Sequence, residues 1–424
     1  MGTLTPIFRS LPLVCIISFW PSIAAWSQIQ WQKEPNPVIN PSVGSFDDDF
    51  AFDPCVTAEK DILRMWYVGM RGSYIFSIGE ALSPAPDGIH WYGYRNNPTF
   101  SPGSGYDASG VRGPSIVKDD QGYKMYYFTG PGNQFTIGLA TSSDGYTWVR
   151  YSGNPVLTPG ASGSWDQVGV WAPSVIYENN VYKMWYTGIG SFFSSVGYAT
   201  SIDGLTWQKH AGNPVVVTGN SREFDYRTVG EASVIRQNGF YHMFYTGADG
   251  SSPNKIGYAR STDGLIWVKN GSPVLLNGPS SWDVTHVGGC SVIYWENRFH
   301  MWYSGYGGSS GWQIGYATSL DQGLREDRDA IELIGNFPNP FNPSTRIEFF
   351  VPEKGKVRLV VFDMLGREVS SEERFFDQGR QEFSWNGRTN RGLPVSSGAY
   401  IAKLVFEGQS GKSTVVLHKM TYLR

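Results

Sequence analysis

Two acidic residues occupy a position that is small in the other copies of a repeated segment. The segment is about 58 residues long and occurs five times between Trp31 and Gly323. Each copy contains an aromatic-Asp pair, which allows the copies to be aligned. The residues six positions after the aspartate are Asp53, Gly113, Ala172, Glu231 and Gly289. The two carboxylates are therefore the clearest candidates for chemistry in the chain.

A carboxylate at a packed position costs free energy unless it is solvated or paired. Asp49 lies four residues before Asp53, and Arg227 lies four residues before Glu231. Four residues of extended strand span about 13 Å, so neither side chain can pair with the carboxylate on its own strand. Two converging carboxylates without structural partners are what acid and base catalysis of glycosidic cleavage requires. The alternative interpretation is that Asp53 and Glu231 are structural, hydrogen-bonding carboxylates.

The repeat predicts the elements that position these residues. Each copy has a β-branched run such as PSVI, an aromatic run such as KMWYTG (183–188), a run such as SVGYATS (195–201), and an Asp-Gly turn before a Trp. Four strands per copy predict an all-β fold, a five-bladed β-propeller over residues 28–323 whose innermost strands line an axial channel. The fifth copy lacks its last strand, so we expect residues 29–33 to complete the last blade.

The aspartates that recur in every copy are predicted to be structural, because Asp side chains cap backbone amides in tight turns. Residues that break the repeat are the candidates for shaping a cleft. Arg112 and Trp171 share one register, where Trp could stack on a sugar ring and Arg could hold a hydroxyl or a carboxylate. For Trp171, a packing role is the alternative. Arg227 and His286 lie at the rim end of their strands, and Asp48 or Asp49 could add charge.

Part of the chain resembles a known enzyme superfamily. FDPCV (52–56), GEASV (230–234) and the S-x-D-G-x-x-W turns resemble the five-bladed propellers of glycoside hydrolase families 43 and 32, and also family 130. The resemblance implies a carbohydrate substrate, with Asp53 as general base or nucleophile and Glu231 as general acid. It implies no cofactor, although a calcium ion beside His286 is an alternative.

The chain departs from the family pattern at one point. These families use a third acidic residue from an intermediate blade, where this chain has Gly113 and Ala172. The rival reading is therefore a catalytically inactive propeller that binds carbohydrate or a surface.

The two ends of the chain predict export. Residues 1–27 combine Arg9, an apolar core and a small-x-small site, as a signal peptide does, and no later segment is long enough to span a membrane. A charged linker (324–335) precedes a predicted immunoglobulin-like β-sandwich (336–424). Its motifs NPFNPST, DMLGREV and SSGAYIAKL resemble the type IX secretion sorting domain, which implies the type IX machinery as a partner and a secreted or cell-surface location. An ordinary accessory domain is the alternative.

Composition narrows the partners further. A net charge of −3 with interspersed charges gives no basic stripe, so nucleic acid is not an expected partner, and we expect a monomer. The aromatic content of 15% is explained mainly by packing between repeats. Cys55 and Cys290 fall on neighbouring inner strands, where both a disulfide and two buried thiols are open.

Overall fold

The computed structural model describes residues 29–72, 74–85, 87–131, 134–279, 281–308, 311–319, 331–337 and 339–423. These residues form strands, turns and loops, which confirms the predicted all-β class. None of them forms a helix that is long and apolar enough to cross a membrane. The predicted signal peptide (1–27) and most of the predicted linker (324–335) lie outside the described residues.

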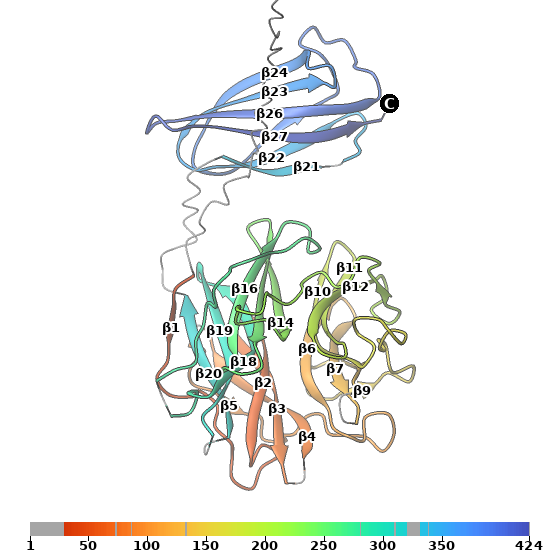
Figure 1. Ribbon diagram of the computed structural model, residues 1–424, viewed down its shortest axis with the longest axis vertical. Helices are drawn as coiled ribbons and strands as arrows, with labels where there is room; N and C mark the ends of the chain where they lie inside the picture. The colour runs from red at the N-terminus through yellow and green to blue at the C-terminus, as the bar shows by residue number, and fades with distance from the viewer. Residues whose placement is uncertain are drawn as a thin grey trace, which may run out of the picture.

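Each repeat folds into a group of antiparallel strands, numbered here as sheets 1 to 5 (Figure 1). Sheets 3 and 4 are joined through one parallel pair, Ser194 with Thr228. Sheet 1 contains β2 (Phe50–Glu59), β3 (Ile62–Arg71), β4 (Ile75–Pro84) and β5 (Tyr92–Gly93). Sheet 2 contains β6 (Arg112–Asp119), β7 (Gly122–Thr129), β8 (Thr136–Ser142) and β9 (Val149–Arg150). Sheet 3 contains β10 (Gly169–Glu178), β11 (Val181–Ile189), β12 (Ser194–Ser201) and β13 (Gln208–Lys209). Sheet 4 contains β14 (Thr228–Gln237), β15 (Phe240–Ala248), β16 (Lys255–Ser261) and β17 (Val268–Lys269).

Sheet 5 is completed by the start of the described chain. It contains β18 (His286–Trp295), β19 (Arg298–Tyr306) and β20 (Trp312–Ser319), and its outer strand is β1 (Trp31–Lys33). Trp31 pairs with Ser319 and Lys33 with Ala317 in an antiparallel ladder. The predicted completion of the last sheet by residues 29–33 is confirmed, and it covers an edge that would otherwise be open to pairing.

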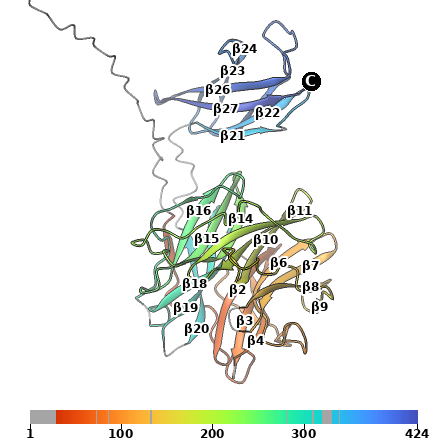
Figure 2. The same ribbon diagram turned by 45° about the vertical axis from the view of Figure 1, so that its right-hand side comes forward.

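The inner strands β2, β6, β10, β14 and β18 surround a common axis (Figure 1, Figure 2). Each contacts the next, and β18 contacts β2, so the ring is closed. A side chain on each inner strand accepts a hydrogen bond from a backbone amide of the next. The bonds are Ile116 N to Cys55 Sγ (3.4 Å), Val175 N to Ser115 Oγ (2.9 Å), Val234 N to Ser174 Oγ (3.0 Å), Val292 N to Ser233 Oγ (3.0 Å) and Val56 N to Ser291 Oγ (2.9 Å). Cys55 thus takes the place of a serine in this circle.

The aromatic second strands join neighbouring sheets at the Asp-Gly turns. Trp185 is fully buried, and its indole N–H donates to the carbonyl of Gly264 in the next sheet (2.9 Å). Equivalent bonds link Trp66 to Gly145, Tyr126 to Gly204 and Trp302 to Gly88. These contacts confirm the interpretation of the repeated aromatics as packing between repeats.

The recurrent aspartates have structural contacts, as predicted. In the Asp-Gly turns, Asp203 Oδ1 accepts the amides of Leu205 and Thr206 (both 2.8 Å). The aspartates of the aromatic-Asp pairs do more than cap turns. Asp225, for example, accepts from Tyr245 (2.9 Å) and pairs with Lys269 (2.7 Å).

Residues 331–337 and 339–423 form two antiparallel sheets around one apolar core. One sheet contains β21 (Glu332–Phe337), β22 (Thr345–Val351) and β25 (Gly379–Trp385). The other contains β23 (Gly355–Asp363), β24 (Glu368–Phe376), β26 (Gly398–Gly408) and β27 (Ser413–Tyr422). The first strand begins at Glu332, ahead of the expected boundary at residue 336.

Candidate active site

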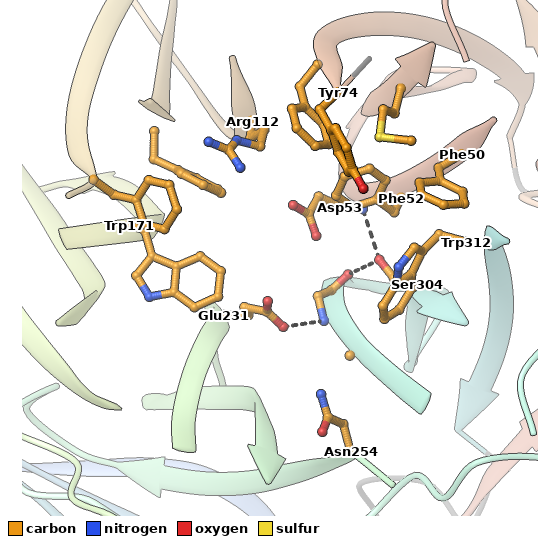
Figure 3. Close-up of a pocket in the computed structure, with 16 residues that line it drawn as sticks. Phe50, Phe52, Asp53, Tyr74, Arg112, Trp171, Glu231, Asn254, Ser304 and Trp312 are labelled. Carbon is orange, nitrogen blue, oxygen red and sulfur yellow. Dashed lines mark hydrogen bonds between the residues drawn. The ribbon is translucent and has the colours of Figure 1, made fainter. Parts of the chain in front are cut away.

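A cavity of about 330 Å³ at the centre of the ring contains both Asp53 and Glu231 (Figure 3). It adjoins a narrow axial channel of about 50 Å³, and both carboxylates line the two spaces. The channel is lined by all five aligned residues, namely Asp53, Gly113, Ala172, Glu231 and Gly289. The alignment of the repeats therefore locates the residues that converge on the axis.

The backbone at the aligned position is left-handed in every sheet. The φ angles are +49° at Asp53, +54° at Gly113, +45° at Ala172, +47° at Glu231 and +46° at Gly289. The pairing of the first two strands shifts register at this point in each sheet, as in a β-bulge. Glycine adopts this conformation without strain, whereas a side chain costs on the order of 1 kcal/mol. Asp53 and Glu231 thus combine backbone strain with a partly buried carboxyl group, and such strain is found at functional sites.

Glu231 is held by two hydrogen-bond donors. Its Oε2 atom accepts from the Thr246 hydroxyl (2.7 Å) and from the backbone amide of Gly289 (3.1 Å). Its own backbone amide donates to Thr187 Oγ1 (2.9 Å). These contacts fix the side chain and favour its ionised form.

Asp53 is close to Glu231 but differently placed. Its backbone amide donates to Ser304 Oγ (2.9 Å), while none of the described residues donates to its carboxylate. A Cβ on Gly289 would lie only 2.6 Å from Asp53 Oδ1. Gly289 thus gives the space for Asp53 and an amide for Glu231, and the two side chains converge on it.

Both carboxyl groups have raised pKa values. Burial raises the pKa of Asp53 well above its usual value, repulsion from Glu231 raises it further, and Arg112 opposes the shift. Burial also raises the pKa of Glu231, against the effect of the bonds from Thr246 and Gly289. Because Glu231 has these donors, we assign the ionised form to Glu231 and the proton to Asp53 when the pair holds a single proton.

The cavity walls differ in chemistry. Sheets 1 to 3 contribute mainly aromatic side chains, whereas sheets 4 and 5 contribute small or polar residues and one aromatic ring, that of Trp312. The apolar wall is Phe50, Phe52, Met70, Tyr74, Phe76, Phe128, Phe135 and Trp171, and the other residues are Arg112, Asn254, Gly288, Ser304 and Trp312 with the aligned pair and Gly289. Arg112 and Trp171, both predicted for substrate binding, line this cavity.

The other three predicted binding residues are not among the described lining residues. Asp49 Oδ2 accepts from the amide of Gly72 (2.7 Å), so it supports a loop. Arg227 is exposed and runs past Gly250. His286 Nδ1 accepts from the amide of Asn254 (3.2 Å), and its ring stacks near Trp312. His286 therefore positions two residues that do line the cavity.

Sequence reasoning missed several lining residues. Ser304 could have been found, because the second strands carry Ser or Thr at this register in sheets 3 to 5 and Val68 or Phe128 in sheets 1 and 2. Tyr74 and Asn254 lie at or beyond the ends of strands, where the repeat gives no alignment.

Asp53 and Glu231 are the acidic residues among the described lining residues, and Asp48 and Asp49 do not supply a third. Within the described ranges, no cluster of three His, Cys, Asp or Glu side chains could hold a metal ion. Cys55 and Cys290 are both free thiols. The burial of Cys55 raises its pKa to about 11, which makes it a poor nucleophile at neutral pH.

The strain at the aligned position leads to a stability prediction. We expect Ala172→Gly to raise the free energy of unfolding by about 1 kcal/mol, because it relieves only backbone strain. Asp53→Gly should raise the free energy of unfolding further, because it also removes a partly buried carboxyl group whose pKa is raised. The pKa of Asp53 is raised in the folded chain, so the wild-type chain loses stability as the pH rises from the usual carboxyl range through that pKa. The stabilisation of Asp53→Gly relative to the wild-type chain should therefore grow with pH. Urea unfolding at several pH values measures this, and destabilisation by Asp53→Gly would indicate a structural carboxylate.

No family model matches the chain. The chain is 28% identical over 265 residues to an uncharacterized protein of Mycobacterium tuberculosis, a match that covers 59% of this chain and 85% of the relative. It is 28% identical to the 1,2-beta-oligomannan phosphorylase of Thermoanaerobacter sp. (strain X514) over 31% of this chain and 46% of that enzyme. It is 27% identical to the probable arabinan endo-1,5-alpha-L-arabinosidase A of Aspergillus fumigatus over 54% of this chain and 65% of that enzyme.

Solved structures show the same fold. A glycosyl hydrolase from Bacteroides ovatus matches with a TM-score of 0.56 at 19% identity, over 68% of this chain and 93% of that one. The beta-1,2-mannobiose phosphorylase of Listeria innocua matches with a TM-score of 0.53 at 14% identity, over 70% of this chain and 98% of that one. Two of these relatives are named as enzymes that act on glycans, and the structural neighbours share the fold, which supports the predicted resemblance at the superfamily level.

Proposed function

We propose that the chain hydrolyses glycosidic bonds of oligo- or polysaccharides, with Asp53 and Glu231 as its acid-base pair. The observation that carries the proposal is the placement of two strained, partly buried carboxylates on one cavity of the ring. Relatives that are named as an arabinanase and as mannoside phosphorylases act on the same class of bond.

The electrostatics favour a definite division of roles. We assign the acid to Asp53, which carries the shared proton and delivers it to the leaving oxygen. Glu231, ionised and held by Thr246 and Gly289, activates water or attacks the anomeric carbon. This division reverses the one implied by the sequence resemblance. The reversal follows from the hydrogen-bond donors to Glu231, about which the resemblance says nothing.

Water fits the cavity better than phosphate as the acceptor. Phosphate is normally held by several cationic or amide donors. The described lining residues include one cation, Arg112, which also faces the carboxylate pair. We therefore propose hydrolysis, although two of the relatives are phosphorylases.

The pH dependence follows from the two raised pKa values. Activity requires a protonated Asp53, so it should fall as the pH rises through the pKa of Asp53. It also requires an ionised Glu231, so it should fall as the pH drops through the pKa of Glu231. Because both pKa values are raised, we expect a bell-shaped kcat/KM profile whose two limbs lie above the usual carboxyl range near 4. An acidic limb at the usual carboxyl pKa would contradict the assignment.

The experiment that tests this function is sugar release from a panel of plant and algal polysaccharides and aryl glycosides. The full chain is compared with Asp53→Asn and Glu231→Gln. Loss of release in both variants supports the hydrolase. Saturable carbohydrate binding that Trp171→Ala weakens, without any release, would instead support a binding propeller, which the small residues Gly113 and Ala172 favour.

We propose a wider setting for this site. The five sheets are interpreted as the blades of a five-bladed β-propeller, in support of which the inner strands contact one another in a closed ring. Residues 336–424 are proposed to be an immunoglobulin-like sorting domain for type IX secretion. With the signal peptide at residues 1–27, this would give a monomeric protein that is secreted or held at the cell surface. Detection of the chain in culture medium, and its retention in the cell when residues 336–424 are deleted, would test this.

A further inference from the structure

Arg112 is an unusual feature of the cavity wall. It begins β6, directly before Gly113, and its guanidinium carbon lies 4.7 Å from the ring centre of Phe76, 5.1 Å from that of Phe128 and 4.9 Å from that of Phe135. Figure 3 shows the guanidinium facing the cavity near Asp53. The aromatic rings therefore hold this cation in one orientation.

Asp53 is the acidic neighbour of Arg112, but the two do not form an ion pair. Arg112 makes no ion pair with any described residue, and its recorded hydrogen bond is a long one, from Nη2 to the carbonyl of Gly130 (3.4 Å). Its Nε atom is buried without a partner among the described residues. Ring stacking satisfies the faces of a guanidinium but leaves its N–H edge free. A partly desolvated guanidinium with free donors is stabilised when an anion enters the cavity.

The shape of the site favours one kind of anion. A guanidinium presents a planar fork that matches the two oxygens of a carboxylate. Trp171, at the same register of the next inner strand, lines the same cavity and can stack on a sugar ring. An anion carried by the sugar would thus meet the cation of Arg112, with the acid-base pair nearby.

We propose that Arg112 binds the carboxylate of a uronic acid residue, so that the substrates of this site are acidic oligosaccharides. The inference rests on the proposed function, because it names the substrate class of the same cavity. A role limited to neutralising Asp53 would affect neutral and acidic sugars equally, and this difference makes the proposal testable.

Binding is measured first, without turnover, in the full chain carrying Glu231→Gln. Calorimetric titrations compare glucuronate and galacturonate oligosaccharides with the matched neutral oligosaccharides. We expect the uronates to bind at least 10-fold more tightly, and Arg112→Met to remove that preference, a loss on the order of 10- to 100-fold. Arg112→Lys, which keeps the charge but not the fork, should lose part of it. Arg222→Met, which removes an exposed charge outside the cavity, should retain it.

Turnover is measured next, with 4-nitrophenyl glucuronides and galacturonides beside the matched glucosides and galactosides. Cleavage of neutral glycosides without uronate preference would overturn the inference and leave the hydrolase in place. Uronate-selective binding without any cleavage would uphold the inference and remove the proposed function. A third outcome is that inorganic phosphate competes for the site in an Arg112-dependent way and forms a sugar phosphate. That result would overturn the inference, because Arg112 would then bind phosphate as the acceptor and not a carboxylate of the substrate.

Discussion

Replacing Glu231 with Gln is expected to lower kcat by roughly 10²- to 10⁴-fold on any cleaved glycoside, the usual contribution of a positioned acid or base. The amide cannot activate water or attack carbon, although it can still accept from Thr246 and Gly289. Asp53→Asn should produce a loss of similar size on substrates with poor leaving groups. The kcat of the double variant should be only a little below that of the less active single variant, because the two residues act as one unit.

Two controls separate the roles of the pair. Azide should restore turnover to Glu231→Ala, because a small anion can replace the missing carboxylate. Asp53→Asn should recover much of its activity when the leaving group is 4-nitrophenolate, which needs no proton. The opposite result, in which azide rescues an Asp53 variant and the 4-nitrophenyl substrate rescues a Glu231 variant, would assign the general acid to Glu231, as the family resemblance implies. Full activity in both variants would show that the pair does no chemistry.

Replacing Trp185 with Ala should lower the free energy of unfolding by about 3–5 kcal/mol, the range for large aromatic truncations in a core. The side chain is fully buried, and its indole N–H joins sheet 3 to the carbonyl of Gly264 in sheet 4. Truncation would leave a cavity and would remove one of the two donors to this carbonyl, which would keep its bond from the indole N–H of Trp267 (2.9 Å). Urea unfolding of the full chain measures the change.

The repeat itself supplies a matched control for this prediction. Sheet 4 has Phe244 where sheet 3 has Trp185, and Phe244 is also fully buried. Trp185→Phe should therefore cost less than half as much as Trp185→Ala. Equal losses would mean that the hydrogen bond to Gly264, rather than ring packing, carries the stabilisation.

The repeat made much of the ring predictable. Alignment of five copies gave the sheets, the completion of sheet 5 by residues 29–33 and the convergence of Asp53 and Glu231, because equivalent residues of a closed repeat share one distance from the axis. The alignment also separated structural aspartates such as Asp225 from the two acidic residues that break the pattern, Asp53 and Glu231.

What the sequence could not supply depends on the orientation of side chains, both within one copy and between copies. Nothing in the spacing places Thr246 and the Gly289 amide on Glu231 rather than on Asp53, so the pKa order could not be read. His286 was assigned to the substrate because of its register, but its ring faces Asn254 and Trp312 instead. Residues at or beyond strand ends, such as Tyr74, follow no repeat, and their approach to the cavity is decided by tertiary packing.

The most direct test of the central claim is a product analysis in H₂¹⁸O with inorganic phosphate present. The full chain and its Asp53→Asn and Glu231→Gln variants are incubated with the best glycan of the panel, and the released sugar is examined by mass spectrometry. Hydrolysis by the pair predicts free sugar with one ¹⁸O at the anomeric carbon from the wild-type chain and almost none from either variant. A sugar phosphate, or the same labelled sugar from all three proteins, would contradict it.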